Sequence, residues 1–312
     1  MLSHITPSVL AALGGVLGIL VVASLIAALL KRLHPDKNYT ELIQRIRSWW
    51  IMIGIFSGAI LLSRTASILF FAFVSFLALK EYVSLIPTRR ADRRVLFWAY
   101  AAIPFQYYWV HEQWYGMFII FIPVYLFLLL PMRMVIIGET KDFLRAAGTL
   151  HWGLMTMVFS LSHAAFFLVL DGARNPAGGG AGLVLYLIFL TQFNDVAQYV
   201  WGKLTGRHKI IPKVSPNKTW EGFLGGVGTT TALAMVLAPH LTPLTLVESL
   251  GAGLLIALGG FIGDVTISAL KRDIGVKDSG SLLPGHGGIL DRIDSLTYTA
   301  PLLFHFVYYL HY

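Results

Sequence analysis

The sequence predicts an all-α, polytopic integral membrane protein, and two observations support this class. Of its 312 residues, 56% are hydrophobic and only 13% are charged, and the mean hydropathy is +0.69. Apolar runs of about twenty residues, long enough to cross a bilayer as helices, recur along the whole chain. The connections between them leave no room for a separate water-soluble catalytic domain, so any chemistry must lie among the helices or at the membrane surface.

We predict ten spans, with nine as the alternative because the second, third and fourth are short or closely spaced. The first run has no basic residue before it, is followed by Lys31 and Arg32, and is too long for a signal-peptide core, so we expect an uncleaved anchor. The predicted spans cover residues 9–30, 49–63, 66–86, 95–111, 114–131, 149–170, 181–202, 220–239, 246–270 and 289–310.

Basic residues divide unevenly between the two sides of this topology. Alternate loops hold 20 of the 24 Lys and Arg residues, whereas the loops on the other side hold only Arg64 and Arg174. Cytoplasmic loops carry an excess of Lys and Arg, so the basic side should face the cytoplasm and both termini should face away from it. The net charge of +8 is then topological, and nucleic acid is not an expected partner.

One polar segment between the first two spans has two interpretations. Residues 35–48 place Leu42, Ile43 and Ile46 against Glu41 and Arg45, a pattern typical of an amphipathic helix lying on the cytoplasmic face. A plain charged loop is the alternative.

The charged residues concentrate near the C-terminus. Nine of the 31 residues from Asp264 to Asp294 are charged. An Asp at the centre of a membrane helix costs roughly 2.5–3.5 kcal/mol on insertion scales, which makes Asp264, among apolar neighbours, a candidate functional residue. The chain has no cysteine, which excludes disulfides, thiolate metal ligands and a Cys nucleophile.

Helical spacing places these acids on two faces. Residues three, four and seven apart share a helix face, as do Asp264, Ser268 and Lys271 in the ninth span and Asp291 and Asp294 in the tenth. Carboxylates that face one another in a low dielectric repel, and a hard divalent ion bound by oxygen ligands would compensate them.

The segment between these two spans supplies groups for anionic oxygens. Lys271, Arg272 and Lys277 are cations, and Gly287 and Gly288 let backbone amides approach a polyphosphate closely. Acids, bases and glycines together indicate metal-assisted phosphoryl chemistry.

The roles of three residues in this segment have more than one interpretation. Asp273 and Asp278 belong either to the site or to a solvated, charge-balanced loop. His286 contacts phosphate, stabilises the loop by a hydrogen bond, or ligates a metal.

Thirteen positions at fixed spacing form one pattern here: Ser268-x-x-Lys271-Arg272, Lys277-Asp278, Pro284-Gly-His-Gly-Gly288 and Asp291-Arg292-x-Asp294. This pattern resembles the signature of the phosphatidate cytidylyltransferases, also called CDP-diacylglycerol synthases. The resemblance is strong over about residues 180–300. We therefore divide the chain into a multispan region, residues 1–180, which gives no information on mechanism, and a catalytic membrane region, residues 181–312.

A second block, Ser215-Pro-Asn-Lys218-Thr-Trp-Glu221-Gly222, resembles the family's Ser-Pro-x-Lys-Thr-x-Glu-Gly segment. Ser215 and Lys218 offer donors for phosphate. Glu221 either holds a base or a cation, or is an acid favoured at a helix N-terminus by the macrodipole.

A third block, Asn194-Asp195-Val-Ala-Gln198-Tyr199-Val-Trp-Gly202, resembles the family's Asn-Asp-x-x-Ala-Tyr-x-x-Gly stretch. Gln198 stands where the family usually has Ala. This departure adds a polar group one turn from Asp195 and leaves open whether the lipid acceptor is the usual one.

The resemblance implies a nucleotidyltransferase that transfers CMP from CTP to phosphatidate, giving CDP-diacylglycerol and pyrophosphate. It implies Mg²⁺ as cofactor, held by Asp264 and Asp291 with Asp294 ligating or orienting, and Asp195 holding a second cation or orienting nucleotide. The catalytic candidates are Asp264, Asp291, Asp294 and Lys271. The expected nucleotide and phosphate contacts are Asp195, Ser215, Lys218, Glu221, Ser268, Arg272, Lys277, His286, Gly287, Gly288 and Arg292.

The expected location is a bacterial cytoplasmic (inner) membrane, with the active site facing the cytoplasm, CTP arriving from there and phosphatidate from the bilayer. A homodimer is an open alternative to a single chain. Two other functions also remain open. A CTP-dependent polyprenol or phytol kinase of the same superfamily would need a base for its alcohol acceptor, and a cation-coupled transporter would show acids spread over several spans.

Overall fold

All ten predicted spans fall on helical structure in the computed structural model, which describes residues 5–36, 38–280 and 287–312. Among these residues, seven helices are long and apolar enough to cross a membrane, which confirms the all-α integral membrane class. They are α1 (Pro7–Leu33), α2 (Thr40–Leu62), α3 (Arg64–Leu85), the run Tyr115–Ile137, α9 (Gly179–Thr205), α10 (Trp220–Leu241) and α11 (Leu246–Asp273).

The other three predicted spans are shorter or less apolar, so the count of ten stays a prediction. They correspond to α4 (Arg93–His111), to the run from α7 (Phe143–Leu154) through η3 (Met155–Ser160) to α8 (Leu161–Phe167), and to α12 (Leu290–Ile293) with α13 (Leu296–His311). The single-turn helices η1 (Arg90–Asp92) and η4 (Gly172–Arg174) lie in connections.

The run Tyr115–Ile137 contains a wider, π-helical turn. It consists of α5 (Tyr115–Ile120), the π-helix η2 (Phe121–Leu126) and α6 (Phe127–Ile137). Pro123 lies within η2 and has no N–H to donate, and a local widening of the helix is one way to accommodate the missing bond. The helix therefore continues through a residue that would otherwise end it.

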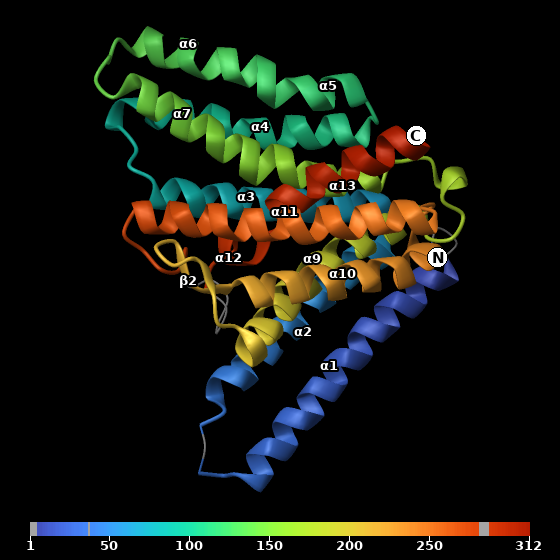
Figure 1. Cartoon of the computed structure of the whole chain (residues 1–312). Coiled ribbons are helices and arrows are strands. Elements are labelled where there is room, and N and C mark those ends of the chain that lie inside the picture. The colour runs from blue at the N-terminus through green and yellow to red at the C-terminus, as the bar shows by residue number, and fades with distance from the viewer. Residues whose placement is uncertain (1–4, 37, 281–286) are drawn as a thin grey trace.

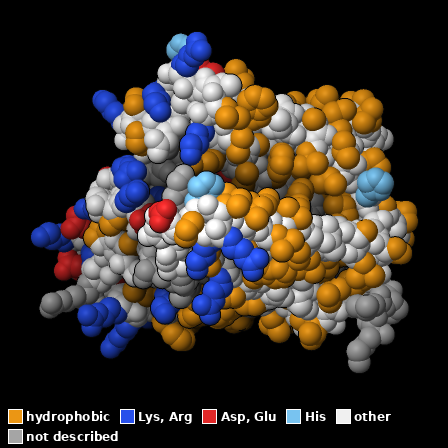
Figure 2. Space-filling view, turned by 90° about the horizontal axis from the view of Figure 1, so that it is seen from below, with side chains coloured by type: hydrophobic (Ala, Val, Ile, Leu, Met, Phe, Trp, Pro, Cys, Tyr) orange, Lys and Arg blue, Asp and Glu red, His pale blue; other side chains and the backbone are white. Residues whose placement is uncertain are grey.

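The two ends of the helical bundle differ in charge. The start of α1 and the end of α13 lie at one end, and the short β-hairpin and α12 lie at the other (Figure 1). Figure 2 shows a face covered mostly by hydrophobic side chains, on which Lys and Arg gather toward the hairpin end. This arrangement agrees with the predicted topology, in which both termini lie opposite the basic loops.

The segment 35–48, predicted to be an amphipathic helix or a loop, is helical from residue 40, but this helix is continuous with the second span. Residues 40–48 form the first turns of α2, which continues to Leu62. Glu41 and Arg45 pair across one turn, and no Pro or Gly occurs before Gly54 to end the helix. The α1–α2 pair leans away from the other helices (Figure 1) and is held by a hydrogen bond from Trp50 Nε1 to Ser24 Oγ, 3.0 Å.

The C-terminal helices pack closely and include the small sheet that the all-α class did not predict. The antiparallel strands β1 (Lys209–Ile211) and β2 (Ser215–Thr219) lie between α9 and α10. Thr219 then caps α10, since its hydroxyl accepts a hydrogen bond from the Gly222 amide at 3.2 Å. On α11, a Cβ at Gly263 would press on the backbone of Ser295, so glycine permits the close approach of α11 to the start of α13.

The C-terminal helix joins the two halves of the chain. Phe304 on α13 packs its ring against Phe118, Phe166 and Phe167, with centroid distances of 6.1, 5.4 and 5.4 Å. All four rings are buried and contribute to one core. The division at residue 180 therefore describes where the motifs lie and stays a prediction.

Candidate active site

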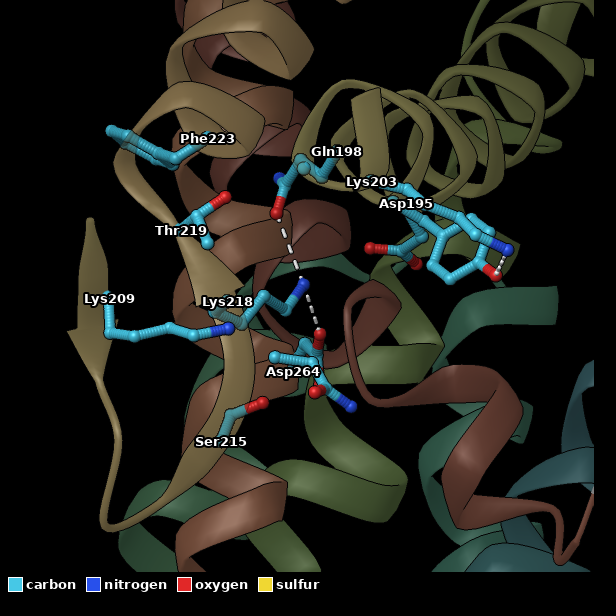
Figure 3. Close-up of a pocket in the computed structure, with 12 residues that line it drawn as sticks. Asp195, Gln198, Lys203, Lys209, Ser215, Lys218, Thr219, Phe223 and Asp264 are labelled. Atoms are coloured by element: carbon cyan, nitrogen blue, oxygen red, sulfur yellow. Dashed lines mark hydrogen bonds and ion pairs between the residues drawn. The ribbon is translucent and has the colours of Figure 1, made fainter. Parts of the chain in front are cut away.

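Three segments meet at the basic end of the bundle and enclose a cavity of about 510 Å³. The C-terminal half of α9 contributes Asp195 and Gln198, β2 contributes Ser215 and Lys218, and α11 contributes Asp264 (Figure 3). The β-hairpin thus brings Ser215 and Lys218 into one cavity with Asp195 and Asp264, although these residues are far apart in the sequence. Two further lysines, Lys203 and Lys209, line the same cavity.

Lys218 is the central cation of this cavity. Its Nζ lies 2.5 Å from Asp264 Oδ2 and donates to Gln198 Oε1 at 3.1 Å (Figure 3). Burial would lower the pKa of this ammonium group, but the carboxylates of Asp264 and Asp195 outweigh it and raise the pKa above its ordinary value. Lys218 therefore stays charged at neutral pH, as a group that binds phosphate must.

Asp195 lies at the junction of three helices. Its two carboxylate oxygens lie 3.1 and 3.0 Å from Ser295 Oγ, which is also 3.1 Å from the Gly260 carbonyl oxygen. The neighbouring Asn194 donates to the Ala257 carbonyl oxygen at 3.2 Å. The Asn-Asp pair of α9 is thus fixed against α11 and the start of α13.

A second cavity, of about 260 Å³, adjoins the first and shares Asp195 and Asp264 with it. Its remaining lining is strongly charged and comes from the signature around α12: Lys271, Asp278, Asp291, Arg292 and Asp294. Asp278, which the sequence left open, therefore borders the site. Asp273 is exposed at the end of α11 and lines neither cavity.

Asp291 has both carboxylate oxygens engaged. Oδ1 accepts from Lys271 Nζ at 2.6 Å, and Oδ2 accepts from the Ser279 amide, the Ser279 hydroxyl and the Gly288 amide at 3.0, 2.9 and 3.1 Å. Gly287, with φ +81°, turns the chain just before these contacts. Asp291 therefore joins Ser279 to Gly288, the two ends of the segment 279–288, which we call the signature loop.

Arg292 and Asp294 both line the second cavity. Arg292 Nε is buried and has no hydrogen-bond partner among the described residues. Asp294 Oδ1 accepts from the Ser295 amide at 2.8 Å, the one hydrogen bond of this carboxylate within the described part of the chain. A guanidinium and a carboxylate with a spare oxygen, both lining one cavity, suit an anionic ligand and a cation, respectively.

The donor set fits a hard cation of the Mg²⁺ type. Asp264 and Asp294 supply oxygen ligands to one cavity, and Mg²⁺ usually takes one or two carboxylates together with substrate phosphates and water. Within residues 5–36, 38–280 and 287–312 no group of three acidic, His or Cys side chains has metal-binding geometry, so substrate oxygens would have to complete the shell.

Several predicted residues act beside the cavities. Ser268 Oγ donates to Asp264 Oδ1 at 3.3 Å, as their spacing of four predicts. Arg272 Nε donates to the Val214 carbonyl oxygen at 3.2 Å and so ties α11 to the hairpin. Lys277 is exposed and lines neither cavity.

Glu221 and Gly288, both predicted to contact nucleotide or phosphate, are engaged in hydrogen bonds within the protein. Glu221 lies in the first turn of α10, as a helix N-terminal acid would, and accepts from the amides of Arg207 and His208 at 3.0 and 3.2 Å. Its Oε1 also pairs with His208 Nδ1 at 2.5 Å, so Glu221 holds a basic side chain as well. The Gly288 amide is engaged by Asp291, so it holds the loop. His286 lies outside the described residues.

Sequence reasoning missed contributions from outside the motifs. Lys209 on β1 had no feature to distinguish it from the other loop lysines. Glu81 on α3 accepts hydrogen bonds from the amides of Ile289 and Leu290 at 2.9 and 3.0 Å. No local spacing relates residue 81 to residue 289, so only the folded chain reveals this contact.

Comparison with known proteins decides the family. The family model described as "Cytidylyltransferase family" matches residues 43–310. The chain belongs to the cytidylyltransferase family. As a member it is a nucleotidyltransferase. Family membership therefore favours the enzyme over the transporter alternative.

Curated relatives of this cytidylyltransferase fall into two groups. "Uncharacterized protein YnbB" of Escherichia coli (strain K12) is 47% identical over 291 residues, covering 93% of this chain and 95% of the relative. Proteins named phosphatidate cytidylyltransferase match a shorter part. That of Staphylococcus aureus (strain COL) is 44% identical over 40% of this chain and 48% of its own, and that of Haemophilus influenzae is 42% identical over 42% and 47%. The match spans about half the length of these enzymes.

Proposed function

We propose that this cytidylyltransferase transfers CMP from CTP to phosphatidate, giving CDP-diacylglycerol and pyrophosphate. The observation that carries the proposal is the pair of adjoining cavities that share Asp195 and Asp264 and are bordered by Lys218, Lys271 and Arg292. Such a site suits two phosphate-bearing molecules that meet at a common wall. The similarity to enzymes named phosphatidate cytidylyltransferase supports phosphatidate as the acceptor.

The chemistry required is an in-line displacement at phosphorus. An oxygen of the lipid phosphate attacks the α-phosphorus of CTP, the bond to the β-phosphate oxygen breaks, and pyrophosphate leaves with that electron pair. Both reactants are anions, so their repulsion dominates the barrier, and cations placed where charge gathers lower it. A phosphate monoester is already ionised near neutral pH, so the site needs no general base.

The position of each residue determines whether it binds phosphate or holds the site in place. Lys218 neutralises phosphate oxygens in the larger cavity, and Arg292, which lines the smaller one, does so there. Lys271 fixes Asp291, and Asp195 fixes the helix junction between the cavities. These groups orient both substrates and hold positive charge at the reacting phosphates.

Asp264 would hold a divalent cation together with Asp294, in preference to Asp291, whose oxygens already accept four hydrogen bonds. When bound, Mg²⁺ would supply charge neutralisation to the phosphate oxygens. A ligand role for Asp291, which the sequence pattern implies, stays a prediction.

The location of the site supports a cytoplasmic supply of CTP. The cavities lie at the end where Lys and Arg gather, and basic loops favour the cytoplasmic side. We propose that the acyl chains of the acceptor remain in the inner membrane while its phosphate enters the site.

The proposal is tested with the purified full chain in detergent micelles, CTP, Mg²⁺ and a panel of acceptors. Phosphatidate should give pyrophosphate and a CMP-containing lipid, and Asp264→Asn should lower the rate at least about 100-fold. Asp273→Asn, a change to an exposed acid on the same helix, is the matched control and should keep the wild-type rate. Turnover of a prenol alcohol in place of phosphatidate would instead support the kinase alternative.

A further inference from the structure

A residue from the N-terminal half reaches the signature loop. Glu81, on α3, accepts hydrogen bonds from the Ile289 amide at Oε2, 2.9 Å, and from the Leu290 amide at Oε1, 3.0 Å. These amides open α12, the short helix whose next two residues are Asp291 and Arg292. One carboxylate on α3 is thus fixed to the start of the element that carries two site residues.

The loop backbone is fitted closely around this carboxylate. A Cβ at Gly288 would overlap both the Glu81 carboxylate and the Ser279 hydroxyl. A Cβ at Gly280 would lie 3.0 Å from Glu81 Oε2. Glycine at both positions allows the two ends of the signature loop to pass directly against Glu81.

The short helix cannot fix its own orientation. α12 has four residues, and helices of this length have no stability in isolation, so tertiary contacts must orient it. Asp291 ties α12 to Lys271 and Ser279, which belong to the same region of the chain. Glu81 adds the contact that ties it to α3, a separate helix of the bundle.

We infer that Glu81 is a positioning residue for the nucleotidyl transfer proposed above: it fixes α12 so that Arg292 faces the second cavity. Glu81 lines neither cavity and acts through the amides it holds. Loss of this anchor lets α12 shift, and small displacements of a charged group from a reacting phosphate lower the rate steeply. The expected loss of rate rests on the proposed function. The anchoring of α12 rests on the two hydrogen bonds of Glu81.

The test compares Glu81→Gln with Glu248→Gln in the full chain. A Gln at position 81 has one acceptor oxygen and one NH₂ group, so it cannot accept from both amides, and its NH₂ faces an N–H. Glu248 is the matched control because it also accepts a backbone amide at a helix start, Thr245 at 2.8 Å, and contacts His311, at the other end of α11. Hydrogen exchange of peptides covering 287–292 and steady-state kinetics are measured for both variants.

Glu81→Gln should speed exchange of the Ile289 and Leu290 amides and lower kcat about tenfold, with the KM for CTP within about twofold of wild type. Glu248→Gln should change neither, at a similar loss of thermal stability. Unchanged exchange in Glu81→Gln, or faster exchange with unchanged kcat, would overturn the inference. A wild-type chain inactive on CTP and phosphatidate would overturn the proposed function, while the exchange data would still decide whether Glu81 holds α12.

Discussion

The site contains two lysine–aspartate pairs of similar length that differ in their surroundings. Lys218 and Asp264 lie 2.5 Å apart, and Lys271 and Asp291 lie 2.6 Å apart. Asp264 has one further partner, Ser268, and borders both cavities. Asp291 accepts three further hydrogen bonds, two of them from backbone amides.

This difference teaches that the same charge pair can serve two purposes. The Lys218–Asp264 pair is exposed to the cavities, with 18% and 22% of the side chains accessible. Substrate phosphate can therefore take the place of Asp264 beside Lys218, and a cation can take the place of Lys218 beside Asp264. The Lys271–Asp291 pair is more enclosed, at 13% and 8%, and joins α11 to the signature loop. The first pair is suited to binding and the second to holding structure.

The largest expected effect sharpens the role of the first pair. Lys218→Met should lower kcat/KM for CTP about 100-fold or more, because it removes the central cation. Lys213→Met, in the exposed turn of the same hairpin, is the control and should keep full activity. Equal activity in the two variants would mean that Lys218 does not contact substrate.

The second pair should respond in stability as well as in rate. Asp291→Leu should destabilise the chain by about 3–5 kcal/mol, since it leaves the buried Lys271 ammonium unpaired, and should lower kcat at least about tenfold. Adding Lys271→Leu should recover much of the thermal stability and none of the activity. Recovery of activity in the double variant would contradict the role of the Lys271–Asp291 pair in positioning the site.

A smaller effect is expected at Gln198. This side chain is 4% exposed, holds Lys218 through Oε1, and leaves Nε2 without a partner among the described residues. Gln198→Ala should raise the KM for CTP about three- to tenfold, because Lys218 keeps Asp264 but loses one hydrogen bond. Gln198→Glu, which keeps an acceptor for Lys218 and adds charge, should raise the KM further. A KM unchanged in both variants would remove Gln198 from the positioning of Lys218.

The smallest effect is expected at Lys277. Although it belongs to the signature pattern, it is exposed and lines neither cavity, so Lys277→Ala should keep kcat and KM within about twofold of wild type. A loss of tenfold or more would show that the loop rearranges when substrate binds and brings Lys277 to the phosphates.

Sequence patterns predicted those parts of the site that depend on local geometry. The spacing of four between Asp264 and Ser268 predicts their shared helix face, and their hydrogen bond confirms it. The pairing of Lys218 with Asp264 joins residues 46 positions apart, and no periodicity defines it. The β-hairpin was missed because its strands have three and five residues, too few for an alternating pattern to be recognised.

Contacts between the halves of the chain lay beyond sequence reasoning. Residues 1–180 carry no motif, and Glu81 became visible as a partner of α12 only in the folded chain. The helical part of the amphipathic segment 35–48 was expected, but its continuity with the second span was not, because a polar first turn and an apolar span can belong to one helix and propensity does not mark the membrane boundary.

The most direct test of the central claim is the fate of the CTP phosphates. Purified wild-type chain with Mg²⁺ and phosphatidate is supplied in parallel with CTP labelled at the α- or the γ-phosphorus, and label in extracted lipid is counted. The α-label should appear in lipid, the γ-label in pyrophosphate, and neither should transfer with Asp264→Asn. Label from the γ-phosphorus in lipid would contradict nucleotidyl transfer at the Lys218–Asp264 pair.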